Sequence, residues 1–179
     1  MTGTITALVV LATLGTLLIR IPIPATTGYF NLGDVFVILA GLWLGPIPGL
    51  LVGAIGPTVA DAIGYPQFIP ATFVTKGLEG LLVGLIALGA KAGLGRKIAA
   101  ACVGVIVVVG GYFVFEAFIY PAVGRSVPFF NVTTLQAAIV EAPLNLIQAG
   151  ISAAVAIGLW KAVSGYQPGK GRRDDSLEP

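Results

Sequence analysis

The chain has 179 residues, enough for one domain, of which 56% are hydrophobic and only 10% are charged. An ordinary soluble domain carries about 25% charged residues, so this composition excludes a soluble protein and predicts an integral membrane protein. With no histidine and one cysteine, Cys102, the chain offers neither a disulfide pair nor an imidazole–thiolate set for a metal or a haem. We therefore expect no cofactor, and no nucleic-acid partner.

Apolar runs separated by Pro- and Gly-rich turns predict an all-α fold of six transmembrane helices. The predicted helices span residues 5–19, 32–44, 47–63, 70–88, 98–120 and 133–163. At 1.5 Å per residue the second rises only about 20 Å, against a membrane core of about 30 Å. It is therefore either a genuinely short helix or part of a hairpin that does not fully cross. Residues 1–163 form one membrane domain, and the polar residues 164–179 are expected to be a disordered cytoplasmic tail.

Two helix starts are predicted from capping patterns. Asn31 is followed three residues later by Asp34, which has the form of an N-cap with an acid in the first turn of the second helix. Thr133 and Gln136 have the spacing of a capping box, which would begin the sixth helix at Thr133.

Basic residues predict the orientation of the helices. With six crossings, both termini share one side of the membrane. That side would hold Lys91, Arg96, Lys97, Lys161, Lys170, Arg172 and Arg173, whereas the other side would hold only Arg20 and Arg125. Both termini are therefore expected in the cytoplasm.

Ionisable residues within the predicted helices all fall in the outward half. A charge at membrane depth costs about 2.5–3.5 kcal/mol on insertion scales, so such residues indicate a functional site. They recur at helical spacing and predict an outward cup for a small molecule. The predicted substrate-binding residues are Lys76, Glu79, Tyr112, Glu116, Tyr120, Glu141, Asn145 and Gln148. A lid or rim is predicted from Tyr29, Phe30, Asp34, Asp61 and Tyr65.

Several of these residues also have a structural interpretation. Lys76 and Glu79 could neutralise each other, and Asn145 and Gln148 could hold helices together by hydrogen bonds. Asp34 could serve as a helix cap. Asp61 could face water, and Tyr29 and Tyr65 could belong to the interfacial aromatic belt. Glu141 has no obvious local partner, which favours a functional role.

Glycine and aspartate spacing carries a family resemblance over about residues 31–84. The matching positions are Gly33-Asp34-Val35, Gly41, Leu44-Gly45-Pro46, Gly49, Gly53, Gly56, Ala60-Asp61 and Gly64-Tyr65-Pro66. They resemble the substrate-binding (S) component of energy-coupling factor (ECF) vitamin transporters. The similarity is closest to the riboflavin-type and hydroxymethylpyrimidine-type S components.

This resemblance implies high-affinity vitamin binding in a prokaryotic plasma membrane, with partners that supply the energy. Those partners are a transmembrane coupling subunit and two ATPases. Residues 22–30 would cover the site. The first helix would dock on the coupling subunit, where the family shows Ala-x-x-x-Ala and this chain has Ala12-x-x-x-Thr16. The glycine-rich phosphate loop of P-loop ATPases is absent from the chain, so it is not expected to hydrolyse ATP.

The acids of the predicted cup favour a ligand with nitrogen donors or positive charge. An aminopyrimidine such as hydroxymethylpyrimidine, thiamine or a vitamer of the pyridoxine class would fit, and riboflavin would fit through aromatic walls. The alternative function is a stand-alone ion-coupled carrier, which would show charges continuing into the inner half. An enzyme is not expected, because the sequence has no histidine and no nucleophile–base set.

Overall fold

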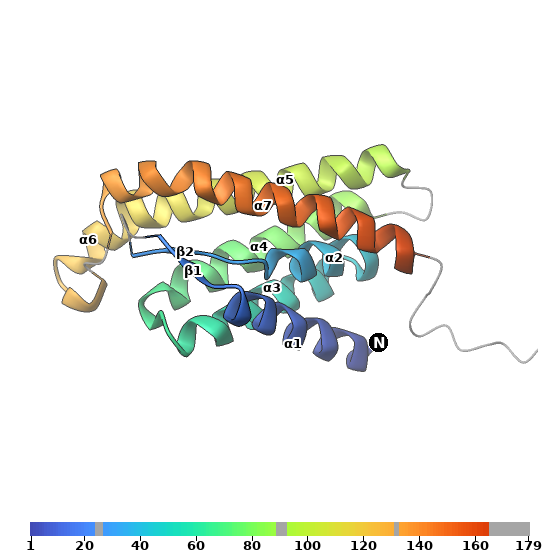
Figure 1. The fold of residues 1–179 in the computed structure, drawn as a ribbon, viewed down its shortest axis with the longest axis horizontal. Coiled ribbons are helices and arrows are strands. Elements are labelled where there is room, and N and C mark those ends of the chain that lie inside the picture. Colours follow the sequence, from blue (N-terminus) through green and yellow to red (C-terminus); the bar gives the residue numbers. More distant parts are fainter. Residues whose placement is uncertain (24–26, 89–92, 131–132, 165–179) are drawn as a thin grey trace, which may run out of the picture.

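The computed structural model describes residues 1–23, 27–88, 93–130 and 133–164, and the predicted tail beyond Ser164 lies outside the described residues. Helices dominate the described chain and run roughly along one long axis (Figure 1). The elements are α1 (Thr2–Leu18), β1 (Ile21–Pro22), β2 (Tyr29–Phe30), α2 (Asp34–Leu44), α3 (Pro46–Ala62), η1 (Pro66–Phe68), α4 (Ile69–Ala87), α5 (Leu94–Val114), η2 (Phe115–Ile119), α6 (Tyr120–Gly124), η3 (Pro128–Phe130) and α7 (Leu135–Val163).

Within the described residues there are six helical rods, because α5, the π-helical turn η2 and α6 follow one another without a break over Leu94–Gly124. This confirms the predicted all-α fold of six helices. Three rods are long and apolar enough to cross a membrane, Pro66–Ala87, Leu94–Gly124 and Leu135–Val163. The strands β1 and β2 form a two-stranded antiparallel hairpin that pairs Ile21 with Phe30 and Pro22 with Tyr29.

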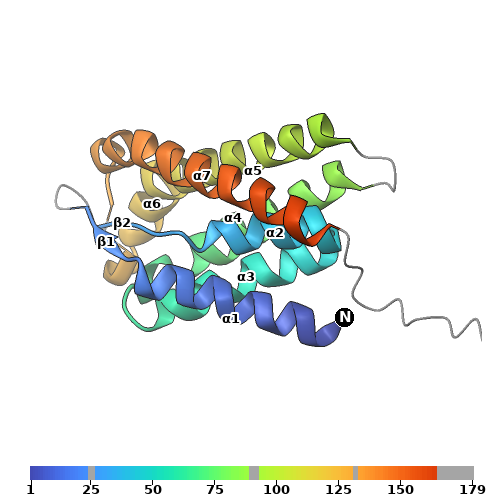
Figure 2. The same cartoon turned by 45° about the vertical axis from the view of Figure 1, so that its right-hand side comes forward.

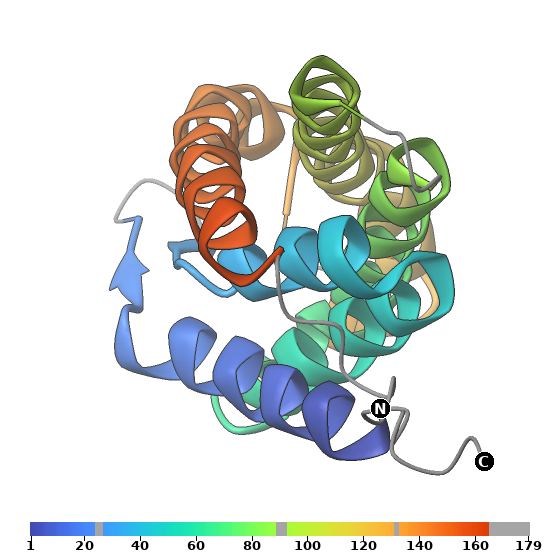
Figure 3. The same cartoon turned by 90° about the vertical axis from the view of Figure 1, so that its right-hand side faces the viewer.

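The hairpin and α6 mark one end of the bundle, here the hairpin end, and the N-terminus marks the other, the terminal end (Figure 2). Viewed from the terminal end, α2 lies in the middle of the bundle (Figure 3). It contacts α1, α3, α4, α5 and α7. Most of its side chains are buried, with Val37, Ile38 and Ala40 fully so. The shortest of the six rods is thus the central one.

The start of α2 differs from the prediction. Its N-cap is Gly33, and no side chain caps the helix. Asn31 instead accepts a hydrogen bond from the backbone N–H of Gly33 through Oδ1, at 3.0 Å, which forms a local turn just before the helix. At the other end, Gly45 has φ 101°, a left-handed conformation that favours glycine and lets α3 begin directly at Pro46.

The start of α7 also differs from the prediction, by one residue. Thr134 is the N-cap, and its hydroxyl accepts from the backbone N–H of Ala137 at 3.2 Å. Thr133 is buried and donates its hydroxyl to the backbone carbonyl of Glu116 at 2.9 Å. The carbonyls of a π-helical turn are displaced from the regular helical pattern, and Thr133 satisfies one of them from outside the helix.

Glycines bring α3 and α4 into backbone contact. A Cβ at Gly53 would overlap the carbonyl oxygen of Lys76, and Gly49 and Gly80 face each other so closely that a Cβ on either would meet the other's backbone. Small residues at this spacing let helices pack closely in a membrane. The two helices therefore form a pair with little room for relative movement.

Lys97 ties two helix ends together at the terminal end. Its ammonium donates to the backbone carbonyls of Leu42, at 2.8 Å, and Ala87, at 2.9 Å. These carbonyls belong to the last turns of α2 and α4, which the helices leave without partners. The ring of Trp160 lies 5.2 Å from the same ammonium. The C-terminal ends of α2 and α4 are thus held at the same level.

Candidate functional site

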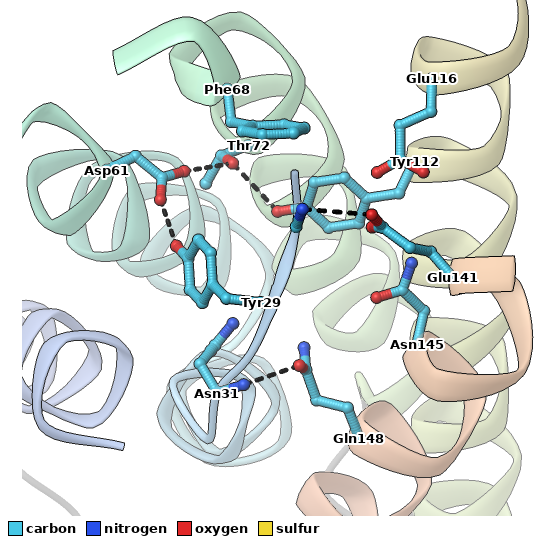
Figure 4. Close-up of a pocket in the computed structure, with 11 residues that line it drawn as sticks. Tyr29, Asn31, Asp61, Phe68, Thr72, Tyr112, Glu116, Glu141, Asn145 and Gln148 are labelled. Carbon is cyan, nitrogen blue, oxygen red and sulfur yellow. Dashed lines mark hydrogen bonds between the residues drawn. The ribbon is translucent and has the colours of Figure 1, made fainter. Parts of the chain in front are cut away.

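A pocket lies at the hairpin end, between the hairpin and the ends of α3, α4, α5 and α7 (Figure 4). Its cavity volume is about 30 Å³, room for only one or two water molecules. Ligand pockets for small molecules measure about 300–1,000 Å³, so a vitamin would fit here only if lining residues moved apart. The pocket is lined by Gly28, Tyr29, Asn31, Asp61, Phe68, Thr72, Tyr112, Glu116, Glu141, Asn145 and Gln148.

Residues 28–31, here the cover segment, pass over one side of the pocket and are fastened to α7. The backbone N–H of Gly28 donates to Oε1 of Glu141 at 3.2 Å, and that of Asn31 donates to Oε1 of Gln148 at 2.7 Å. A Cβ at Gly28 would overlap the carboxyl group of Glu141. Glycine therefore lets the cover segment approach α7 without displacing the carboxyl group of Glu141.

Asp61 fastens the opposite side of the cover segment. The hydroxyl of Tyr29 donates to Oδ1 of Asp61, and the hydroxyl of Thr72 donates to Oδ2 at 2.5 Å. Thr72 also lies 3.0 Å from the hydroxyl of Tyr112. Burial, followed by the negative charge of Asp61, raises the pKa of Tyr29, so its hydroxyl stays protonated and able to donate.

Glu116 and Glu141 both line the pocket, Glu116 from the π-helical turn η2 and Glu141 from α7. Both side chains are buried, at 2% and 3% exposure. Oε1 of Glu141 accepts from Gly28, whereas Oε2 of Glu116 has no hydrogen-bond partner among the described residues. The pocket therefore holds a carboxyl oxygen that is available to a ligand.

A buried ion pair lies behind the pocket. Nζ of Lys76 is 2.5 Å from Oδ1 of Asp34, and both side chains are almost completely buried. Nε2 of Gln148 donates to the other oxygen of Asp34 at 3.3 Å. The ring of Tyr112 lies 5.2 Å from Nζ and separates it from the pocket. Lys76 thus pairs with Asp34 and not with Glu79, and Asp34 acts neither as a helix cap nor as a pocket-lining residue.

Two other predicted binding residues also lie outside the pocket lining. Glu79 is fully buried one helical turn beyond Lys76, and neither of its oxygens has a hydrogen-bond partner among the described residues. The ring of Tyr120 lies behind Phe68, 5.8 Å away in an edge-on contact, and stacks on Phe130. The five other predicted binding residues line the pocket, namely Tyr112, Glu116, Glu141, Asn145 and Gln148.

The predicted rim residues separate into two groups. Tyr29 and Asp61 line the pocket. Tyr65 packs on Tyr29, with ring centroids 4.5 Å apart, and Phe30 lines a different, apolar groove with Ile21 and Leu144. Tyr65 and Phe30 therefore support the hairpin from outside.

The predicted docking residues are not on the surface. Ala12 is fully buried and Thr16 is 1% exposed. Their side of α1 faces α2 and α3, where Gly33 packs against Thr16 and Gly56 against Ala12. A partner could reach these residues only if α1 moved away from its neighbours, so the exposed side of α1 is made by other residues.

Four lining residues were not among the predicted binding or rim residues: Gly28, Asn31, Phe68 and Thr72. Thr72 and Phe68 lie four and eight residues before Lys76, on the same side of the fourth helix, and this spacing could have indicated both. Gly28 lies within residues 22–30, which were expected to cover the site, but its contribution through the backbone N–H has no side-chain signal in the sequence. In the described part of the chain no group of three or more carboxylate or thiol side chains is placed to hold a metal.

Three comparisons with known proteins bear on the site. Residues 1–164 match the family model described as ECF-type riboflavin transporter, S component. An uncharacterized protein from Pyrococcus woesei is 40% identical over 119 residues, which cover 66% of this chain and 80% of that protein. A solved structure of the S component of a bacterial ECF transporter has a TM-score of 0.71, covering 92% of this chain and 95% of that chain at 18% identity. At that identity the structural match supports the fold alone.

Proposed function

Because the chain belongs to the family of ECF-type riboflavin transporter S components, we propose that it binds riboflavin in the hairpin-end pocket and hands it to an ATP-driven uptake complex. The membership confirms the family predicted from the glycine and aspartate spacing, and it makes the chain a membrane-embedded component of a vitamin transporter and not an enzyme. We propose further that the vitamin is riboflavin, that it binds with high affinity and that the chain assembles with other subunits.

The observation that carries the proposal is the set of side chains around the pocket beneath the cover segment. Rings of Tyr29, Phe68 and Tyr112 line it, and they provide flat apolar surface for a ring system. Carboxyl groups and the Asn145 amide provide acceptors and donors for the polar edges of the ligand. A flavin combines both features, a flat ring and a polyhydroxyl chain.

Riboflavin binding by the purified full chain tests the proposal directly. We expect quenching of the flavin fluorescence with a Kd in the nanomolar range, which corresponds to about −12 kcal/mol. Asn145→Leu should weaken binding at least about 10-fold, because a pocket amide loses its hydrogen bonds. The control is Cys102→Ser, an exposed position outside the pocket. If riboflavin does not bind while thiamine, hydroxymethylpyrimidine or pyridoxine does, the assignment of the vitamin is wrong.

The proposed partners are a transmembrane coupling subunit and two ATPase subunits, with the chain in the prokaryotic plasma membrane and both termini in the cytoplasm. Co-expression with these subunits should yield one complex, and uptake into proteoliposomes should require enclosed ATP. Uptake by the isolated chain that follows a proton or sodium gradient would instead identify an ion-coupled carrier.

A further inference from the structure

A second cavity lies at the terminal end of the bundle, and we propose that it binds the phosphate headgroup of an anionic phospholipid through Lys97 and Arg96. The cavity lies between the last turns of α2 and α4 and Lys97 in the first turn of α5, and its volume is about 180 Å³ (Figure 2). That is room for several water molecules, and thus for one phosphate group. The inference goes beyond the proposed function, because it does not depend on which vitamin the chain binds.

Lys97 is the charged side chain that lines this cavity. It is 8% exposed, and its ammonium donates to the carbonyls of Leu42 and Ala87 at 2.8 and 2.9 Å. A lysine ammonium has three N–H donors, so one donor is left after these two bonds. The same two bonds hold the ammonium at the wall of the cavity. A ligand there meets a cation that the fold has already positioned, so little ordering is lost on binding.

Arg96 and the start of α5 add to the positive potential. Nε of Arg96 donates to the carbonyl of Ile86 at 2.6 Å, which holds the guanidinium beside the end of α4. The side chain is exposed and forms no ion pair among the described residues. The first turn of α5 contains no acid and no side-chain cap. A helix N-terminus favours an anion, and no acidic side chain of this turn competes for the place.

The carbonyls at the ends of α2 and α4 do not cancel this charge. A helix C-terminus carries about −0.5 elementary charge, so the two ends together contribute about −1. Lys97 and Arg96 contribute two full positive charges, and the N-terminus of α5 adds about +0.5. The acids of these two helices, Asp34 and Glu79, each lie eight residues before the carbonyls that Lys97 binds, about 12 Å along the axis. The net charge around the cavity is therefore positive.

Tryptophan marks this end of the bundle as a membrane interface. Of the two tryptophans in the chain, Trp43 lines the cavity, and the ring of Trp160 lies 5.2 Å from the ammonium of Lys97. Tryptophan is enriched at the level of the lipid headgroups. Basic pockets between transmembrane helices on the cytoplasmic side bind phosphate-bearing headgroups. The surrounding lipid leaflet is therefore the nearest source of a phosphate group for Lys97.

The two tryptophans also provide the measurement. The full chain is reconstituted in phosphatidylcholine vesicles with a minor fraction of phosphatidylglycerol, and bromine atoms on the acyl chains of one lipid or the other quench the tryptophans that they contact. Each basic residue near a headgroup contributes about 5-fold in affinity. We therefore expect phosphatidylglycerol to bind beside Trp43 and Trp160 at least about 10-fold more tightly than phosphatidylcholine.

Arg96→Gln should lower the preference for phosphatidylglycerol about 5-fold, because one positive charge is lost. The control is Lys161→Gln, which removes an exposed charge from the last turn of α7, outside the cavity lining, and should change the preference less. Lys97→Met should remove most of the preference. If thermal unfolding shows that Lys97→Met does not fold, Arg96→Gln still tests the site.

Equal quenching by the two brominated lipids would overturn the inference, because the cavity would then not select an anionic headgroup. Equal losses in Arg96→Gln and Lys161→Gln would assign the preference to diffuse surface charge. Displacement of brominated phosphatidylglycerol by millimolar inorganic phosphate would assign the cavity to free phosphate and not to a lipid. The Kd of riboflavin should be the same in Arg96→Gln as in the wild-type chain, since the two sites lie at opposite ends of the bundle (Figure 2). A chain that binds no riboflavin would overturn the proposed function and leave this inference standing.

Discussion

The backbone N–H of Asn31 donates to the side-chain oxygen of Gln148 at 2.7 Å, which joins the cover segment to the middle of α7. The side-chain amide of Gln148 also donates, through Nε2, to Asp34 at 3.3 Å. One side chain therefore links the cover segment to the buried ion pair of Asp34 and Lys76. Each of its two polar atoms has a different partner, so no other residue type of this size can replace it without losing one bond.

Gln148→Met should loosen the cover segment, because it keeps the length of the side chain but removes both hydrogen bonds. The buried N–H of Asn31 would lose its partner, which costs about 1–3 kcal/mol. We expect riboflavin affinity to fall about 10-fold or more, mainly through faster dissociation in stopped-flow measurements. Leu146→Met is the matched control, since Leu146 lies two residues away on the exposed side of α7. Equal dissociation rates in the two variants would contradict a role for Gln148 in holding the cover segment.

Lys76→Met should destabilise the fold strongly, because it leaves Asp34 as a buried carboxylate without its cation. Removing one partner of a buried ion pair costs about 3–5 kcal/mol. The double variant Lys76→Met/Asp34→Asn should recover most of this loss, since neither charge remains. Thermal unfolding in detergent measures both. A double variant no more stable than Lys76→Met would show that the pairing itself contributes little.

Gly53→Ala should disrupt the contact between α3 and α4. The added methyl group would overlap the carbonyl oxygen of Lys76, which is backbone and cannot turn aside. We expect a loss of about 1–3 kcal/mol from overpacking. Gly150→Ala is the control, because a Cβ at Gly150 meets no atom within 4 Å and alanine favours a helix. A stable Gly53→Ala protein would mean that the two helices can separate without cost.

Tyr29→Phe should weaken ligand binding by removing a donor to Asp61, which would then rely on Thr72. The loss of one hydrogen bond to a charged group corresponds to about 1.5–3 kcal/mol, or roughly 10-fold or more in affinity. Because the pKa of Tyr29 is raised, the hydroxyl keeps its proton above the usual tyrosine value near 10. The difference between wild type and Tyr29→Phe should therefore persist at about pH 10.5, where a tyrosine of ordinary pKa would be mostly ionised, and a difference that vanishes between about pH 9 and pH 10.5 would contradict the raised pKa.

The polar stripe on α7 was predictable from the sequence because a regular helix keeps its spacing. Glu141, Asn145 and Gln148 recur at helical intervals and all three line the pocket. The number of helices followed equally from the apolar runs and the Pro- and Gly-rich turns between them. Both predictions depend on local periodicity, which the fold preserves.

Other features depend on tertiary contacts, which the periodicity of the sequence does not reveal. Tyr120 was predicted beside Tyr112 and Glu116, but it follows the π-helical turn η2, which contains Glu116 and changes the direction of the later side chain. The pairing of Lys76 with Asp34 joins two helices through tertiary packing, whereas Glu79 was the nearer acid in sequence. Ala12 and Thr16 were predicted as docking residues because they match the family's Ala-x-x-x-Ala spacing, but the side on which α1 packs cannot be read from its nearly uniform apolar composition.

The tie between Lys97 and the ends of α2 and α4 sets the depth of the pocket. At 1.5 Å per residue α2 is about 16 Å long and α4 about 28 Å. Because the C-terminal ends of the two helices are level, the N-terminal end of α2 stops about 12 Å short of that of α4. The cover segment and the pocket occupy the volume that further turns of α2 would fill. A ligand seated there lies near half the thickness of a membrane core of about 30 Å. Because the central helix is short, a ligand bound in this pocket is thus already about half-way across the membrane core.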